Sequence, residues 1–451
     1  IGGMPGEALT PIDVVKFAAA YSVWLKKRAG KSKLSVVVGR DARISGEMVS
    51  NLIIGTLMGC GIDVTDIGLA TTPTVEIAVP LQNADGGIIL TASHNPKQWN
   101  ALKLLNEKGE FMNAAEGAAL LEIAERGDFD FVDVDDLGKL SHNDTYTDKH
   151  IEAVLNLPTV DIDAIYRANF KVVVDAVNSV GGIAIPKLLK ALGVQVVELY
   201  CEPNGQFPHN PEPLPEHLTE ISKVVVAEGA DLGVVVDPDV DRLALVCENG
   251  EMFGEEYTLV AVADYLLSKQ VGNTVSNLSS SRALRDVTEQ HGGEYFSAAV
   301  GEVNVVTKMK EVNALIGGEG NGGVIYPASH YGRDALVGVA LFLSHLAHKK
   351  MKVSELRASY PPYFISKNKI ELTPSIDVDG ILKSMKEKYA SQRINDIDGV
   401  RIDFDAEKKW VHLRKSNTEP IIRIYAEANT MDTADALAQQ IITDIKQLAG
   451  I

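Results

Sequence analysis

Short apolar runs rich in β-branched residues alternate with longer amphipathic stretches along most of this chain. Residues 34–39 form such a run and predict a buried strand, and the stretch 46–58 after it predicts a helix. The pattern repeats up to about residue 362, which is typical of layered α/β domains. We expect strands at residues 34–39, 87–91, 170–175, 194–199, 232–236, 295–299 and 315–316. We expect helices at residues 46–58, 113–126, 181–192, 254–267, 303–310 and 334–348.

The pattern changes after Pro361 and Pro362, where predicted strands follow one another closely. A small α+β module is indicated by strands at 394–404, 409–413 and 421–426 and a closing helix at 433–448. We therefore predict an α/β protein with three similar α/β domains and a smaller C-terminal α+β domain, a number of domains that suits 451 residues. The acidic stretch 127–136 is expected to connect the first domain to the second. We expect the four domains to span residues 1–147, 148–251, 252–362 and 363–451.

The charge balance changes the picture by excluding some partners. The chain has 43 Lys and Arg against 61 Asp and Glu, a formal net charge of −18. Nucleic acid is therefore not expected as a partner, although a cleft can still focus positive potential on a small anion. No apolar run approaches the ~20 residues of a membrane span, so no membrane partner is expected. The three cysteines are scattered and odd in number, which favours a reducing cytoplasm, and no secretory signal is recognisable in a sequence that opens at Ile1.

A serine follows the predicted strand 87–91, in the motif Thr-Ala-Ser-His-Asn-Pro at residues 91–96. The Asn-Pro pair restricts the backbone and indicates an exposed turn that presents Ser93. Serine is a weak nucleophile unless a base or an electrostatic field assists it, and a phosphoserine is a compact dianion. The alternative is a turn in which Ser93 and Asn95 only satisfy backbone groups.

Three aspartates, Asp237, Asp239 and Asp241, alternate directly after the apolar run 232–236. Their side chains project close together, and their mutual repulsion makes the cluster costly unless a cation lies among them. Hard oxygen ligands suit Mg²⁺, which also accepts a phosphate oxygen. Because Pro238 and the preceding strand fix the turn, we favour a metal site over a solvated acidic turn.

Two later loops carry groups suited to a polar ligand. Residues 317–323 hold five glycines around Glu319 and Asn321, which offer hydrogen bonds to sugar hydroxyls or form only a tight loop. Residues 414–420 place an arginine, a lysine and hydroxyl groups in one short segment, with Arg423 beyond. These donors match phosphate geometry, and the alternative is a basic, solvated hairpin loop.

The segment Gly-Arg-Asp-Ala-Arg at residues 39–43 follows the first predicted strand and is less specific. An arginine near a strand end faces an anion or pairs with Asp41 at the surface. The sequence alone leaves both interpretations open.

Together and in this order, the motifs at residues 91–96, 237–242, 317–323 and 414–420 resemble those of the α-D-phosphohexomutase superfamily. This superfamily includes phosphoglucomutase, phosphomannomutase and phosphoglucosamine mutase. The resemblance covers essentially the whole chain, and it implies a four-domain enzyme whose signatures face a central cleft. It also implies a Mg²⁺-dependent phosphohexomutase that interconverts hexose 1-phosphate and hexose 6-phosphate through a phosphoserine, with a hexose 1,6-bisphosphate as intermediate and activator.

The resemblance also assigns roles to single residues. Ser93 is the phosphorylated residue, and it holds Mg²⁺ together with the three aspartates of residues 237–241. Arg40 and Arg242 support the phosphoserine region, and Lys103 is the candidate general acid/base. The expected substrate-binding residues are His94, Glu319, Asn321, Arg414, Ser416, Asn417, Thr418 and Arg423.

The sequence departs from the superfamily pattern in three places. Many members have Asn-Gly-x-Lys after the serine motif, and here residues 100–103 read Asn-Ala-Leu-Lys. Many have Ser-Gly-His in the sugar loop, and here residues 321–323 read Asn-Gly-Gly, so that His330 is the nearby histidine that can replace the missing base. Members usually begin with a Gly-x-Arg-Gly segment that lies close to the phosphoserine, and the printed sequence opens at Ile-Gly-Gly without it.

Several functions and substrates remain open at this point. The sugar is glucosamine, glucose or mannose phosphate, with a lean to phosphoglucosamine mutase, and the alternative is a phosphoglucomutase/phosphomannomutase of dual specificity. A Mg²⁺-dependent sugar phosphatase needs no grip on a second phosphate, and the phosphate loop argues against it. A non-catalytic sugar-phosphate sensor would be expected to have a damaged serine or carboxylate motif. Monomer and homodimer are both compatible with the sequence.

Overall fold

The computed structural model describes residues 9–371, 377–415 and 421–449. The chain divides into two compact units. One comprises Ile1–Thr258 with Asn321–Ser354, and the other comprises Leu259–Gly320 with Glu355–Ile451. Among the helices that the structure describes, none is both long enough and apolar enough to cross a bilayer.

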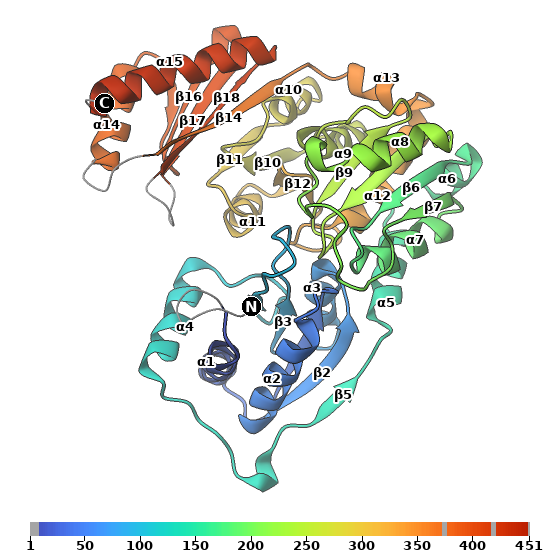
Figure 1. Cartoon of the computed structure of the whole chain (residues 1–451), viewed down its shortest axis with the longest axis vertical. Helices are drawn as coiled ribbons and strands as arrows, with labels where there is room; N and C mark the ends of the chain where they lie inside the picture. The colour runs from blue at the N-terminus through green and yellow to red at the C-terminus, as the bar shows by residue number, and fades with distance from the viewer. Residues whose placement is uncertain (1–8, 372–376, 416–420, 450–451) are drawn as a thin grey trace. The chain divides into compact units, whose positions relative to one another are not determined.

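The first unit begins with a five-stranded sheet in the order β4-β3-β1-β2-β5 (Figure 1). β1 lies in the centre, parallel to β2 and β3, and its valines alternate between two cores. Val36 and Val38 pack with α1, α2 and α4, whereas Val37 packs with α3 on the opposite face. The elements are α1 (Pro11–Ala29), β1 (Leu34–Arg40), α2 (Gly46–Gly59), β2 (Ile62–Leu69), α3 (Thr72–Leu81), β3 (Gly86–Leu90), β4 (Leu102–Leu105), α4 (Ala114–Arg126), η1 (Val134–Asp136) and β5 (Leu140–His142).

A four-stranded sheet follows in the same unit, in the order β7-β6-β8-β9. β8 is buried along its whole length because α8 packs on one face, and Gly181 of α7 lies against Val236 on the other. The elements are α5 (Tyr146–Leu155), α6 (Ile162–Ala168), β6 (Lys171–Asp175), α7 (Gly181–Ala191), β7 (Gln195–Leu199), η2 (Pro215–His217), α8 (Thr219–Ala227), β8 (Leu232–Val236) and β9 (Leu243–Cys247), with β13 (Gly323–Ile325) and the buried helix α12 (Ala335–Lys349) completing the unit.

The second unit contains a parallel arrangement of β10 between β11 and β12, and an antiparallel sheet in the order β14-β18-β17-β16-β15. α14 and α15 cover one face of the antiparallel sheet (Figure 1). The boundary between the units falls within two helices, α9 (Glu255–Lys269) and α13 (Val353–Ala358). The other elements are β10 (Asn273–Asn277), α10 (Ala283–Gln290), β11 (Tyr295–Ala298), α11 (Glu302–Glu311), β12 (Ala314–Glu319), β14 (Phe364–Glu371), α14 (Val378–Lys388), β15 (Arg393–Asn395), β16 (Val400–Phe404), η3 (Asp405–Glu407), β17 (Lys409–Lys415), β18 (Ile421–Ala428) and α15 (Met431–Ala449).

Two expectations from the sequence are wrong. The predicted strand 394–404 is two strands, β15 and β16, because the chain turns between them at Gly399, whose φ of 73° favours glycine. The stretch 127–136 does not lead out of the first sheet. It carries the chain to β5, which pairs with β2 at the edge of that sheet. The other predicted strands and helices are confirmed within a few residues.

Candidate active site

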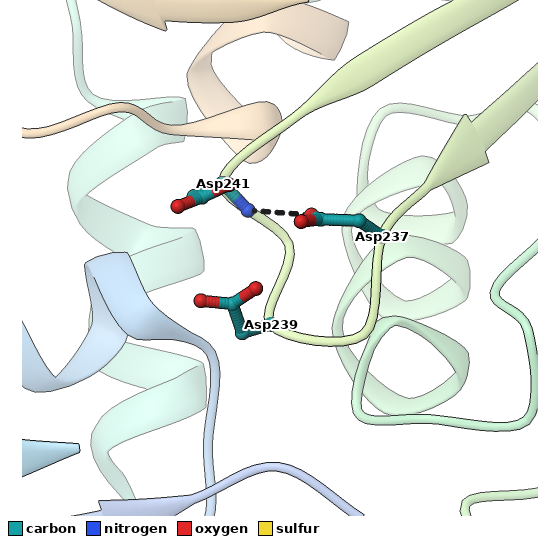
Figure 2. A group of neighbouring side chains, drawn as sticks. All are labelled: Asp237, Asp239 and Asp241. Carbon is teal, nitrogen blue, oxygen red and sulfur yellow. Dashed lines mark hydrogen bonds between the residues drawn. The ribbon is translucent and has the colours of Figure 1, made fainter. Parts of the chain in front are cut away.

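The three aspartates of the metal loop, residues 237–241, lie together at the carboxyl end of β8 (Figure 2). All three side chains are fully buried, and a carboxylate oxygen from each lies within 4.8 Å of the others. The backbone N–H of Asp241 donates to Asp237 Oδ1 at 3.1 Å and closes the turn. Val240 adopts a φ of 64° there, which is an outlier for a β-branched residue and directs the flanking carboxylates to one side.

The carboxylates of the metal loop are only partly neutralised by protein groups. Lys103 Nζ lies 2.6 Å from Asp239 Oδ2 and 3.2 Å from Asp241 Oδ2, and Arg333 Nη2 lies 2.6 Å from Asp241 Oδ2. Within the described part of the chain, no hydrogen-bond donor reaches Asp239 Oδ1 or Asp241 Oδ1. A buried carboxylate oxygen without a partner is costly, and oxygen ligands of this kind suit a hard divalent cation. The donor set therefore fits a metal ion.

Burial and charge act in opposite directions on these carboxyl groups. Burial, reinforced by the neighbouring Asp241 and Asp239, raises the pKa of Asp237 well above its usual value. Burial also opposes ionisation of Asp241, but the cations Arg333, Lys103 and Arg242 outweigh it and hold the pKa of Asp241 below its usual value. One loop thus contains carboxyl groups with opposite shifts, which is common at functional sites.

Ser93 lies beside the metal loop, in the turn between β3 and β4. Its Oγ donates to Asp237 Oδ2 at 2.9 Å, and His94 Nδ1 lies 3.4 Å from the same Oγ. Ser93 has a φ of 49°, in the left-handed region that few non-glycine residues adopt. Strained backbone of this kind is frequent where a side chain must be presented for chemistry. The structure therefore brings together the serine and the aspartates that the sequence singled out separately.

Near Ser93 lie the two expected supporting cations, Arg40 and Arg242, and the expected general acid/base, Lys103. Arg242 lies near Glu212 and Asp241, at 3.8 and 3.9 Å, and Arg40 Nη1 donates to the carbonyl of Asp41. For Lys103, burial favours the neutral amine, but Asp239 and Asp241 outweigh it and raise the pKa of Lys103 above its usual value. Lys103 is therefore an ammonium group in this arrangement. A cavity of about 1340 Å³ is lined by both Ser93 and Lys103.

His330 does not replace the missing histidine of the sugar loop as a base. Its Nδ1 lies 3.3 Å from Glu76 Oε2, and its Nε2 lies 3.1 Å from Asp334 Oδ2, which also contacts His150 at 2.8 Å. Burial lowers the affinity of His330 for a proton, but the two carboxylates dominate and raise its pKa to about 10. His330 is charged at neutral pH with both ring nitrogens engaged, so the expectation of a general base there is wrong.

The two residues expected to contact sugar hydroxyls, Glu319 and Asn321, belong to different units. Glu319 is at the end of β12, where its Oε1 accepts from Asn277 Nδ2 at 2.9 Å and from the N–H of Gly301 at 3.1 Å. Asn321 Oδ1 accepts from the N–H of Gly323 at 3.2 Å. The adjacent Gly322 adopts a φ of 85° and packs against the backbone of Leu243.

Two of the expected phosphate-binding residues, Arg414 and Arg423, lie directly opposite each other on β17 and β18. Like charges facing each other across a strand pair are destabilising, and an anion between them relieves the repulsion. Arg414 Nε donates to Asp398 Oδ1 at 3.0 Å, which fixes the guanidinium, and Arg423 is exposed. Ser416, Asn417 and Thr418, the other expected members of this loop, lie outside the described residues.

Sequence reasoning missed two buried arginines at the site. Arg333 precedes α12 and pairs with Asp241 across 92 positions of sequence. Arg43 pairs with Asp41, which is one of the two interpretations of residues 39–43, but the pair is buried and not at the surface. The Arg43 side chain also reaches the carbonyl of Ser93. Burial of these arginines has no local sequence signal, because each contact depends on the tertiary fold.

Comparison with known proteins identifies the family of this chain. Models of the phosphoglucomutase/phosphomannomutase domains match the chain in order: alpha/beta/alpha domain I at residues 1–131, domain II at 148–250, domain III at 254–363 and the C-terminal domain at 371–443. A phosphoglucomutase/phosphomannomutase of Thermococcus kodakarensis is 37% identical over 442 residues, which cover 96% of this chain and 94% of the relative. The chain belongs to the phosphoglucomutase/phosphomannomutase family. It is a phosphohexomutase, an intramolecular phosphotransferase of the isomerase class, as its motifs predict.

Other relatives agree with this assignment. A phosphoglucosamine/phosphogalactosamine mutase of Sulfurisphaera tokodaii is 32% identical over 451 residues, covering 98% of this chain and 96% of the relative. A crystal structure of a phosphoglucomutase/phosphomannomutase family protein from Burkholderia thailandensis has a TM-score of 0.86 and 26% identity, covering 99% of this chain and 96% of that one. The predicted α/β class of fold is confirmed by this likeness.

Proposed function

We propose that this phosphohexomutase interconverts hexose 1-phosphate and hexose 6-phosphate through phosphorylated Ser93, with glucosamine phosphate as its preferred substrate. The observation that carries the proposal is the 2.9 Å contact between Ser93 Oγ and Asp237 Oδ2, beside carboxylate oxygens that no hydrogen-bond donor reaches within the described part of the chain. A serine in that position can carry a phosphoryl group next to a bound cation. Phosphoryl transfer depends mainly on such positioning and charge neutralisation.

The metal we infer is Mg²⁺, held by Asp237, Asp239, Asp241 and the phosphoserine. Its contribution is to neutralise charge on the phosphoryl oxygens. Two features support this choice, the buried all-oxygen donor set and the oxygens of Asp239 and Asp241 that accept no hydrogen bond from the described residues.

The residues of the chain then have distinct tasks in the transfer. In the first half-reaction the bond from phosphorus to Ser93 Oγ breaks and a bond from phosphorus to the free sugar hydroxyl forms, while that hydroxyl loses a proton and Ser93 Oγ gains one. In the second half-reaction the other phosphate of the hexose 1,6-bisphosphate returns to Ser93 Oγ, while Ser93 Oγ loses its proton and the released sugar oxygen gains one. Lys103, held as an ammonium between Asp239 and Asp241, is the group we assign to this proton transfer: it donates a proton to the oxygen that phosphorus leaves and recovers one from the oxygen that phosphorus joins. His94, 3.4 Å from Ser93 Oγ, is assigned to substrate binding at this end.

Binding of the spectator phosphate is assigned to Arg414 and Arg423, together with Ser416, Asn417 and Thr418. The facing arginines of β17 and β18 support this assignment. We assign the sugar hydroxyls to Glu319 and Asn321, and support of the phosphoserine region to Arg40 and Arg242. The lean towards glucosamine rests on relatives, among them the phosphoglucosamine/phosphogalactosamine mutase of Sulfurisphaera tokodaii. Dual specificity for glucose and mannose phosphates is the second candidate, since the Thermococcus kodakarensis relative has that name.

We also propose domain boundaries at residues 147, 251 and 362, and a cytoplasmic location in which Cys60, Cys201 and Cys247 stay reduced. All three are free thiols, and Cys60 and Cys247 are buried.

The proposal is tested by assaying the protein, with Mg²⁺ and a trace of hexose 1,6-bisphosphate, on the 1-phosphates of glucosamine, glucose and mannose. We expect 6-phosphates to form, fastest from glucosamine 1-phosphate. Ser93→Ala should lower kcat by about 10⁴-fold or more, because the group that carries the phosphoryl is removed. Release of inorganic phosphate in place of a 6-phosphate would support a phosphatase instead. Faster turnover of glucose and mannose 1-phosphates would assign dual specificity.

A further inference from the structure

The Arg43 side chain is almost completely buried, with 1% of its surface exposed, and each of its nitrogens that carries hydrogen is engaged. Nε donates to Asp41 Oδ2 at 3.0 Å. Nη1 donates to the carbonyls of Pro96 and Trp99 at 2.8 and 3.0 Å, and Nη2 donates to those of Ser93 and Asn95 at 2.5 and 2.8 Å. The five donors of a guanidinium group are thereby all in use.

Four of these acceptors belong to one turn, residues 93–99, which begins within the serine motif of residues 91–96. The carbonyls of Ser93, Asn95, Pro96 and Trp99 converge on this buried guanidinium, and that of Pro96 also accepts from the N–H of Trp99. Arg43 thus binds all four carbonyls from one planar group. Because the turn places Ser93 in a left-handed conformation with a φ of 49°, it needs such outside support to persist.

Arg43 is itself fixed to both sides of the site. Asp41, which accepts from Arg43 Nε, also accepts from Thr91 Oγ1 at 2.7 Å, just before the serine motif. The N–H of Ala42 donates to Ser179 Oγ at 3.3 Å, and this hydroxyl donates to the carbonyl of Pro238 at 2.7 Å in the metal loop. A continuous chain of hydrogen bonds therefore joins the Ser93 turn to the metal loop through residues 41–43.

We propose that Arg43 is a positioning residue, which sets the place of Ser93 relative to the metal loop. The proposal rests on the proposed role of Ser93 as phosphoryl carrier. Arg43 binds neither substrate nor phosphate, because backbone carbonyls and Asp41 occupy all of its donors. Its effect on turnover passes through the backbone of the turn.

The substitution Arg43→Lys tests this role while it keeps the charge. A lysine has three donors on one nitrogen and cannot reach four carbonyls and Asp41 together. We expect the turn to loosen and Ser93 to leave its alignment. A displacement of about 1 Å at a reacting group can cost about 10²-fold in rate.

Arg401→Lys is the matched control. Arg401 is also buried, with 6% of its surface exposed, and donates to the carbonyl of Leu278 and to Asp403. It lies over the ring of Trp410 at 4.2 Å in the second unit and has no part in the proposed chemistry. Both substitutions shrink a buried guanidinium, so a loss that comes only from stability should affect both proteins alike.

Three measurements on the full chain are needed. For Arg43→Lys we expect kcat to fall by about 10²-fold with KM changed less than about 3-fold. We expect hydrogen exchange to quicken in residues 91–100, and the affinity for Mn²⁺, used as a spectroscopic probe of the metal loop, to change less than about 3-fold. For Arg401→Lys we expect a lower Tm with kcat within about 3-fold of the unsubstituted protein.

The proposal is overturned if Arg43→Lys keeps its kcat, if exchange in residues 91–100 is unchanged, or if Arg401→Lys loses as much activity. Should Arg43→Lys fail to fold, Asp41→Asn carries the test, because it weakens the anchor of Arg43 and should quicken exchange in the same segment. Exchange reports the turn without any assay of turnover. A failure of the mutase assignment is therefore distinguishable from a failure of the positioning role.

Discussion

The metal loop and the pair of facing arginines on β17 and β18 differ in how far their charged side chains are buried. In the metal loop the three carboxylates are fully buried, and Lys103 and Arg333 are held against them. In the antiparallel sheet of the second unit, Arg414 keeps 27% of its side chain exposed and contacts one carboxylate, Asp398. Its neighbour Arg423 is exposed.

This difference in burial follows from the role proposed for each region, phosphoryl transfer at the metal loop and phosphate binding at the arginines. Groups around a reacting phosphoryl must hold one geometry, and burial makes their interactions strong and directional. Groups that bind and release a phosphate must remain accessible, and a long exposed side chain gives binding at the cost of rigidity. Substitutions in the first region should therefore affect kcat, and those in the second should affect KM.

The largest effect is expected from Asp239→Asn in the metal loop. Asp239 has one oxygen engaged by Lys103 and Thr72 and one that accepts no hydrogen bond from the residues that the structure describes, so the amide removes a charge where a cation is proposed to bind. We expect kcat to fall by about 10²–10³-fold, the size of loss seen when one stabilising group is removed from a reacting centre. Chelation with EDTA should abolish activity in the unsubstituted protein, and added Mg²⁺ should restore it.

Asp148→Asn provides the control for Asp239→Asn, since Asp148 is exposed and pairs with Lys187 on the surface. It should retain full activity. Equal activity of Asp239→Asn and Asp148→Asn at saturating Mg²⁺ would exclude the metal loop from the chemistry.

A smaller effect is expected from Arg414→Ala on β17. Hydrogen bonds to charged groups contribute about 1.5–3 kcal/mol, so KM should rise by about 10- to 100-fold. We expect kcat to change much less, because the residue is proposed to hold the phosphate that is not transferred. Steady-state kinetics on the preferred hexose 1-phosphate separates the two parameters.

Arg393→Ala is a suitable comparison for Arg414→Ala, since Arg393 is an exposed arginine on the edge strand β15 of the same sheet and pairs with Asp403 and Asp405. It should leave both parameters unchanged. A fall in kcat with KM unchanged for Arg414→Ala would contradict the division between the two regions.

The smallest effect concerns stability at alkaline pH, through the buried network around His330. Its pKa is raised from 6.5 to about 10, chiefly by Asp334 and Glu76 acting against burial. Since folding then favours the protonated form, the contribution to the free energy of unfolding is complete below pH 6.5 and is lost as the pH rises through about 10.

Urea unfolding of the unsubstituted protein and of His330→Gln at pH 6, 8 and 9.5 measures this contribution. The free energy of unfolding should fall with pH in the former and vary less in the latter. His142→Gln serves as control, because His142 is a largely exposed histidine paired with Asp66. Parallel pH profiles for His330→Gln and the unsubstituted protein would show that the network does not bind the proton.

Much of the fold could be predicted from the sequence because buried parallel strands are continuous apolar runs. β1 and β8 are such strands, and the aspartates that follow β8 are adjacent in sequence, so their grouping needed no knowledge of tertiary structure. α1 was missed although Thr10 and Pro11 form a recognisable helix start.

The rest of the site depends on contacts between distant segments. The pairings of Ser93 with Asp237 and of Arg333 with Asp241 span 144 and 92 positions. Arginine is usually exposed, so nothing local indicates that Arg43 is buried beneath the Ser93 turn. His330 is the opposite case. Its position in the sequence suggested a general base, and its contacts with Glu76 and Asp334 in the tertiary structure remove that role.

The left-handed conformations of Ser93 and Val240 have a consequence for how the protein can evolve or be engineered. Each costs on the order of 1–2 kcal/mol, and they lie in the two loops whose side chains meet at the 2.9 Å contact of Ser93 with Asp237. The fold spends part of its stability at the place where chemistry is proposed. The substitution Val240→Gly would recover some of that stability, but it would also free the backbone that orients the carboxylates. A search for more thermostable variants would therefore tend to select against turnover at this position.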